Sequence, residues 1–110
     1  MIKVFISQPM NGKTDEEIQF ERAIAIKDAT QQVQDIYPDN WDEDGNQVEI
    51  MDTVIKDFSP DTHPLVYLGE SIKMLAEADV VYFARGWFNA HGCCIERDCA
   101  KKYGKHCINY

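Results

Sequence analysis

Residues 2–36 of the chain, IKVFISQPMNGKTDEEIQFERAIAIKDATQQVQDI, contain the strand, loop and helix from which the fold can be predicted. The run Ile2–Ile6 is rich in β-branched and aromatic residues, which is typical of a strand that is buried on both faces. Thr14 followed by Glu17 is a capping-box sequence, so a helix is expected to begin there. Apolar residues then recur every three or four positions until Pro38, which cannot continue a helix.

The rest of the chain repeats this alternation of strand and helix. Pro64 suits the first position of a helix, and Gly104 suits the left-handed position that follows one. Strands that alternate with helices pack as a parallel sheet, so we predict an α/β fold: a small doubly wound parallel sheet of about four strands with helices on both faces. The further elements expected are strands at Val48–Met51, Asp79–Phe83 and His106–Tyr110, and helices at Pro64–Ala78 and Cys93–Tyr103.

The size and charge of the chain restrict its class. A length of 110 residues is enough for one domain, residues 1–110, and too short for two cores. The net charge of −8 repels nucleic-acid phosphates and anionic lipid headgroups. No apolar run is long enough to span a bilayer, and the N-terminus has no secretion signal. We therefore expect a cytoplasmic protein that binds neither a nucleic acid polymer nor a membrane.

The cysteines and acidic residues suggest two kinds of metal site, and neither pattern is complete. The four cysteines crowd near the C-terminus without a C-x-x-C pair, which favours reduced thiols and no zinc site. The segment Asn40–Gly45 matches the opening of a calcium-binding loop, but Met51 stands where that loop needs a bidentate glutamate. We therefore expect a solvated acidic loop, no metal and no cofactor. The four cysteines are Cys93, Cys94, Cys99 and Cys107.

In doubly wound folds, ligands bind beyond the carboxyl ends of the strands, where each strand turns into the next helix. Two segments are predicted to lie there, Ser7–Lys13 and Ala84–Glu96. In the first, Gly12 and Lys13 precede a capped helix, which is compatible with an anion site or with an ordinary tight turn. No glycine-rich phosphate-binding motif is present.

Glu96 is the principal candidate in the second segment. Counted from Gly92 as the helix cap, it falls near the first turn, where the helix dipole favours an ionised carboxylate. An oriented carboxylate at the ligand crevice can attack the anomeric carbon of a sugar. The plain alternative is an acidic residue that only complements the helix dipole.

Neighbouring side chains allow further interpretations. Trp87 and Phe88 can stack on a nucleobase or close the core. His91 and Asn89 can hydrogen-bond a base edge, or can simply stabilise the loop. A thiolate of Cys93 or Cys94, paired with His91, would be a rival nucleophile. Asp79, at the opposite end of its strand, is expected to be structural.

Three segments carry a family resemblance, together with Ala100 and Gly104-Lys105, which follow the last of them. They are Lys3–Met10, Ala78–Tyr82 and Gly92–Glu96. Together they resemble the nucleoside 2-deoxyribosyltransferase superfamily, which includes nucleoside 5'-monophosphate N-glycosidases. The closest likeness is to a small branch of the superfamily without a described function.

The resemblance implies a flavodoxin-like fold and a small-molecule substrate, either a nucleoside or a nucleotide. It implies cleavage or transfer at the N-glycosidic bond of a 2'-deoxynucleoside or its 5'-monophosphate, through a covalent ester of the sugar with Glu96. It also implies a homodimer or higher homo-oligomer. Substrate contacts are expected from Ser7, Gln8, Met10, Gly12, Ser71, Trp87, Asn89 and Gly92.

Two positions depart from the superfamily pattern. Ser71 stands where an aspartate usually orients the sugar or assists the leaving base, and Phe5 stands where many members have a tyrosine. These departures keep a second hypothesis open, a non-catalytic nucleotide-binding module on the same fold.

Overall fold

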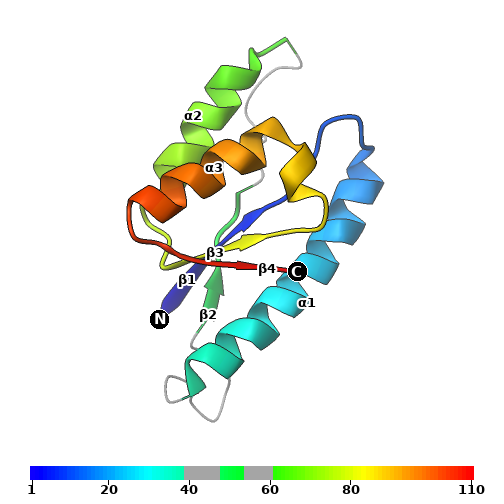
Figure 1. Ribbon diagram of the computed structural model, residues 1–110. Helices are drawn as coiled ribbons and strands as arrows, with labels where there is room; N and C mark the ends of the chain where they lie inside the picture. Colours follow the sequence, from blue (N-terminus) through cyan, green and yellow to red (C-terminus); the bar gives the residue numbers. More distant parts are fainter. Residues whose placement is uncertain (39–47, 54–60) are drawn as a thin grey trace.

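The computed structural model describes residues 1–38, 48–53 and 61–110 (Figure 1). The expected acidic loop at Asn40–Gly45 lies outside these residues. In the described residues the chain alternates strands with helices, as the sequence predicts. The strands are β1 (Ile2–Ser7), β2 (Val48–Ile50), β3 (Val80–Phe83) and β4 (His106–Asn109), and the helices are α1 (Asp15–Ile36), α2 (Pro64–Leu75), the short 3-10 helix η2 (Trp87–Asn89) and α3 (His91–Lys102).

The four strands form one parallel sheet in the order β2-β1-β3-β4. Helix α1 covers one face of the sheet, and α2 and α3 cover the other (Figure 1). Along β1, Val4 and Ile6 pack toward α1, whereas Phe5 packs toward α2 and α3. This alternation follows from the two-residue period of a strand, and it explains why nearly all of β1 is apolar. The predicted doubly wound fold is confirmed.

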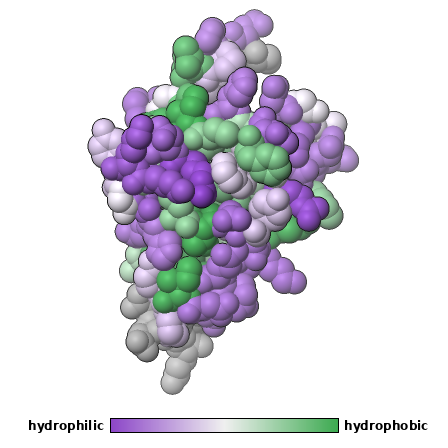
Figure 2. Space-filling model, in the orientation of Figure 1, coloured by the Kyte–Doolittle hydropathy of each residue, from purple (hydrophilic) through white to green (hydrophobic). Residues whose placement is uncertain are grey.

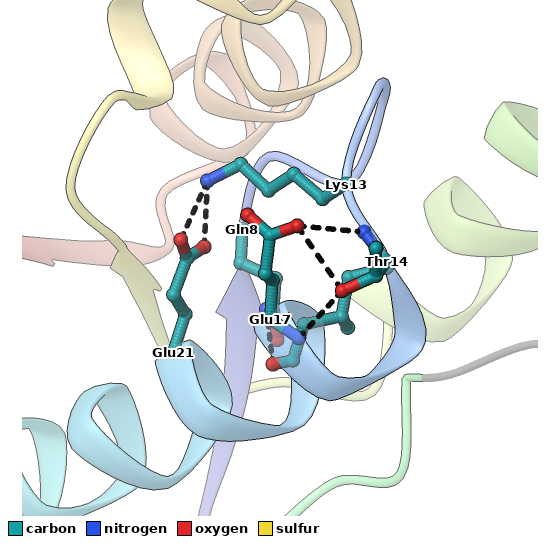
Figure 3. Close-up of polar contacts among 6 residues, drawn as sticks. Gln8, Lys13, Thr14, Glu17 and Glu21 are labelled. Carbon is teal, nitrogen blue, oxygen red and sulfur yellow. Dashed lines mark hydrogen bonds and ion pairs between the residues drawn. The ribbon is translucent and has the colours of Figure 1, made fainter.

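Helix α1 begins as its sequence predicts. The backbone N–H of Glu17 donates to Thr14 Oγ1 at 3.2 Å, and the backbone N–H of Thr14 donates to Glu17 Oε1 at 3.2 Å (Figure 3). Both halves of the capping box are therefore formed. The helix then buries Ala25, Ala29 and Val33 against the sheet. Small side chains at these positions let the helix axis approach the strands closely.

Helix α3 begins earlier than predicted. Its N-cap is Ala90 rather than Gly92, because the backbone N–H of Cys94 already bonds the Ala90 carbonyl at 3.0 Å. Glu96 is consequently the sixth residue of the helix and lies in its second turn. The helix ends at Lys102, one residue before the expected Tyr103. Gly104 follows with φ +74° as predicted, and the Lys105 N–H bonds the Ala100 carbonyl at 2.9 Å.

Helix α2 ends at Leu75, three residues before the expected end at Ala78. The N–H groups of Glu77 and Ala78 bond the carbonyls three residues back, which tightens the chain and ends the helix.

No helix within the described ranges is long and apolar enough to cross a bilayer. The face shown in Figure 2 is largely hydrophilic, with apolar side chains scattered over it.

Candidate functional site

The sheet order places a topological switch point between β1 and β3. From this central pair the chain continues to β2 on one side and to β4 on the other, so the direction of winding changes there. Such a switch point is where doubly wound sheets bind ligands, at the carboxyl ends of the strands. Ser7 and Phe83 are register partners at these ends, and the Ala84 N–H bonds the Ser7 carbonyl at 2.9 Å.

The two segments predicted to form the site meet at this edge. An added Cβ at Gly86, which follows β3, would lie 3.6 Å from Pro9 Cγ, which follows β1. Gly86 has φ +85°, a left-handed conformation that side-chain-bearing residues rarely adopt. The conformation therefore favours glycine at this position, whereas the contact of an added Cβ with Pro9 would be an ordinary van der Waals contact.

A buried hydrogen bond joins Ser7 of β1 to Glu96 of α3. The hydroxyl Oγ of Ser7 donates to Glu96 Oε1 at 2.9 Å. The exposed fraction is 1% for Ser7 and 7% for Glu96. The second carboxyl oxygen, Oε2, has no hydrogen bond to any residue that the structure describes. A nearly buried carboxyl with one free oxygen thus lies at the switch point, where the sequence predicted it.

The electrostatics of Glu96 differ from the sequence-based expectation. Burial raises the pKa of Glu96 to about 7, and the hydrogen bond from Ser7 opposes this shift only in part. The expected help from the helix dipole is weak, because the effect is confined to the first turn and Glu96 lies in the second. Near neutral pH the carboxyl is therefore a mixture of acid and carboxylate, and it can exchange a proton or act as a nucleophile.

Cys93 is buried beside this pair and does not fit the rival role of a reactive thiolate. It is 3% exposed, and burial raises the pKa of its thiol to about 11. The protonated thiol is a poor nucleophile. Cys94, the next residue, is exposed, and its sulfur faces the carbonyls of Trp87 and Phe88 at 3.6 and 3.5 Å.

Trp87 is held by its neighbours rather than left free. Its ring packs on Phe83, with the centroids 5.8 Å apart, and the guanidinium carbon of Arg97 lies 4.6 Å from the Trp87 centroid. The same Arg97 carbon lies 5.2 Å from the Phe83 centroid. This cation–π contact ties the loop after β3 to the helix that carries Glu96. Phe88, set at 90° to Trp87, has the more exposed ring.

The segment after β1 is anchored to α1. The amide nitrogen of Gln8 donates to the Ile18 carbonyl at 3.2 Å, and Lys13 Nζ forms an ion pair with Glu21 at 2.6 Å (Figure 3). Glu21 therefore neutralises the charge of Lys13, in the segment for which the sequence left open an anion site or an ordinary tight turn. Gly12 has φ +78° in the turn closed by the Lys13 N–H and the Met10 carbonyl at 3.2 Å.

Three further candidates have no hydrogen bond to the Ser7–Glu96 pair in the part of the chain that the structure describes. Ser71 is half-buried on α2, and Asn89 is exposed in η2. Gly92 is the second residue of α3, and an added Cβ would meet nothing within 4 Å. A role for these residues in binding a substrate stays a prediction.

Arg22 is a buried polar residue that the sequence analysis missed. It is 9% exposed, and its guanidinium donates to Thr53 Oγ1 at 3.1 Å and to the Met51 carbonyl at 2.9 Å. Thr53 in turn donates to the Ile6 carbonyl at 3.3 Å. Burial lowers the pKa of Arg22, whereas nearby Asp52 raises it. This cluster joins α1 to the carboxyl ends of β1 and β2, on the same edge of the sheet as Glu96.

Comparison with known proteins gives a family without a described role. A family model described as a domain of unknown function (DUF4406) matches residues 2–109. The chain belongs to this family. No curated protein and no solved structure matches the chain. Among the described residues of this DUF4406 chain, no three His, Cys, Asp or Glu side chains converge to hold a metal ion.

Proposed function

We propose that this DUF4406 chain cleaves or transfers at the N-glycosidic bond of a 2'-deoxynucleoside or its 5'-monophosphate, with Glu96 as the nucleophile. The observation that carries the proposal is the buried hydrogen bond between Ser7 and Glu96 at the β1/β3 switch point. The resemblance of Gly92–Glu96 to the deoxyribosyltransferase superfamily supports the choice of substrate.

The reaction has two steps. In the first, an ionised oxygen of Glu96 attacks C1' of the deoxyribose, the C1'–N bond breaks, and the departing base nitrogen takes a proton from solvent. In the second, water or another base attacks C1' of the ester, the C1'–O bond to Glu96 breaks, and the carboxylate is regenerated. With water, the incoming molecule releases one proton, which balances the proton taken up by the base.

Ser7 and the burial of Glu96 contribute in different ways. The Ser7 hydroxyl holds Oε1, which leaves Oε2 free for the sugar carbon. Burial strips water from the carboxylate, so that the ionised form is more basic than an exposed glutamate. As a consequence, Glu96 is protonated in a fraction of the protein molecules at neutral pH, and these molecules are inactive.

The alternative function is a non-catalytic nucleotide-binding module. It is favoured by the low exposure of Ser7 and Glu96, together with the missing aspartate at Ser71. Under this alternative, ligand binding would persist without bond cleavage. The two functions therefore differ in whether a base is released.

The test measures, by chromatography, the release of free base from deoxynucleosides and deoxynucleoside monophosphates. Parent protein is expected to release free base, and Glu96→Gln is expected to lose at least about 100-fold in rate, as nucleophile removal does elsewhere. Glu77→Gln, a change at an exposed carboxylate after α2, is the matched control and should keep the parental rate. Equal rates for the parent and Glu96→Gln would refute the assignment. Binding without release would favour the binding module.

We also propose that the chain forms a homo-oligomer. On α1, Phe20 and Ile24 lie one helical turn apart with exposed fractions of 69% and 56%. Large apolar side chains that adjoin on one helix face are suited to a contact between subunits. Sedimentation at micromolar concentration should show a species larger than 12.7 kDa. A monomer across this range would contradict the proposal.

A further inference from the structure

Thr53 continues the hydrogen-bond ladder between β1 and β2 with its side chain. In the register of these parallel strands, the Met51 N–H bonds the Val4 carbonyl at 2.9 Å. The next carbonyl of β1 that faces this side is that of Ile6, two residues further along. By that point β2 has ended, and the hydroxyl of Thr53 donates to the Ile6 carbonyl at 3.3 Å. A side chain thus fixes the backbone of β1 immediately before Ser7.

Arg22 of α1 orients this hydroxyl, and both side chains are buried. A threonine hydroxyl has one hydrogen to donate and two lone pairs that accept. Its hydrogen is used in the bond to Ile6, so Thr53 Oγ1 is the acceptor for Nη1 of Arg22, at 3.1 Å. The same Nη1 also donates to Gln8 Oε1 at 3.5 Å. One guanidinium therefore contacts the residue after Ser7 directly and the residue before it through Thr53.

Arg22 and Glu96 approach the end of β1 from opposite faces of the sheet. Arg22 is on α1, which covers one face, whereas Glu96 is on α3, which covers the other (Figure 1). Successive side chains of a strand point to opposite faces, so fixing the backbone of β1 from the α1 side sets where the Ser7 side chain points on the α3 side. The carbonyl of Ser7 itself is held from β3, by the Ala84 N–H at 2.9 Å. The strand end that carries the Ser7 hydroxyl is therefore held from both neighbouring strands' sides.

From this arrangement we infer that Thr53, oriented by Arg22, is a positioning residue, which holds the Ser7 hydroxyl where it donates to Glu96. Within the described ranges neither Thr53 nor Arg22 has a hydrogen bond to Glu96, so both act through the strand. The catalytic meaning of the inference rests on the proposed function, in which the bond from Ser7 leaves Oε2 of Glu96 free for the sugar carbon.

The inference predicts that Thr53 and Ser7 act on Glu96 together. Ser7→Ala removes the donor to the carboxylate, so it should raise the pKa of Glu96. Thr53→Val removes the hydroxyl that fixes the strand, keeps the size of the side chain and changes no charge. In that background the Ser7 hydroxyl is held less well, so Ser7→Ala should raise the pKa of Glu96 by a smaller amount. Sites coupled through the backbone usually interact strongly enough for this difference to reach about 0.4 pH unit or more.

The experiment measures the pKa of Glu96 by carbon NMR of its side-chain carboxyl in the parent, both single variants and the double variant. Thr53→Ser keeps the hydroxyl and should preserve the full effect of Ser7→Ala. Thr30→Val, the same substitution at a half-buried position of α1, is the control and should also preserve it. Arg22→Lys keeps the positive charge without the forked donors, so it should reduce the effect as Thr53→Val does, and it tests the same coupling if Thr53→Val does not fold.

An effect of Ser7→Ala that is equal within error in the parent and in the Thr53→Val or Arg22→Lys background would overturn the inference. So would a Thr53→Ser background that behaves like Thr53→Val. Lower stability with an intact effect of Ser7→Ala would mean that Thr53 is only structural, which also overturns it. The titration needs no substrate, so absence of base release with intact coupling would refute the proposed function and leave the positioning role standing. Base release without coupling would do the reverse.

Discussion

Replacing Glu96 by glutamine should change how the stability of the protein depends on pH. Burial raises the pKa of this carboxyl from its ordinary value of 4.5 to about 7. Between these values the folded state holds a proton that the unfolded chain releases, so the free energy of unfolding falls as the pH rises. From pH 5 to pH 8 the loss amounts to about 2.5 kcal/mol. Glutamine does not titrate, so Glu96→Gln should be free of this loss.

The assay is urea unfolding of the parent and of Glu96→Gln at several pH values from 5 to 8. The difference between the two free energies of unfolding cancels the contributions of all other titrating groups. It should shift by about 2.5 kcal/mol in favour of the variant across the range. Glu77→Gln, at an exposed position, should follow the parent throughout. A difference between parent and Glu96→Gln that stays constant with pH would refute the reasoning, because it would mean that the carboxyl titrates alike in both states.

Three further predictions concern activity, a buried cation and two glycines. Base release should rise with pH through an apparent pKa near 7, because only the ionised carboxylate of Glu96 attacks the sugar; a flat rate from pH 6 to pH 8 would contradict this. Arg22→Met should lower the free energy of unfolding by about 2–3 kcal/mol in urea titrations, because buried acceptors lose their donor; an unchanged urea midpoint would show that the buried bonds contribute nothing. Gly104→Ala should cost about 1–2 kcal/mol in thermal unfolding, since φ is +74° there. Gly69→Ala, inside α2 where an added Cβ meets nothing within 4 Å, should instead stabilise by up to about 1 kcal/mol; equal effects at the two glycines would contradict the backbone argument.

Features of the fold that depend on local chemistry could be predicted from the sequence. Thr14 and Glu17 form the capping box that their spacing indicates, and Gly104 takes the left-handed conformation after α3. The parallel sheet follows from the alternation of elements, because that order has few other compact solutions. Asp79 lies at the amino end of the sheet as expected, where its carboxylate accepts from the Lys3 N–H at 2.9 Å.

The features that could not be predicted depend on packing. The sequence predicts the cap of α3 at Gly92, because the alanine side chain of the actual cap, Ala90, gives no capping signal. The pKa of Glu96 depends on burial by β1, which is distant in sequence. Arg22 did carry a signal, since it lies four residues after Ile18 and three before Ala25, on the stripe that was expected to be apolar. Its partners come from the segments after β1 and β2, whose positions periodicity does not predict.

In the proposed reaction, Glu96 forms a covalent bond to a sugar. The direct measurement is peptide mass spectrometry of protein mixed with a deoxynucleoside or its monophosphate and quenched rapidly in acid. We predict that the peptide containing Glu96 gains the mass of the deoxyribosyl group or its phosphate, and that Glu96→Gln shows no such gain. Base release with an unmodified Glu96 peptide, or an adduct on another residue, would contradict the account.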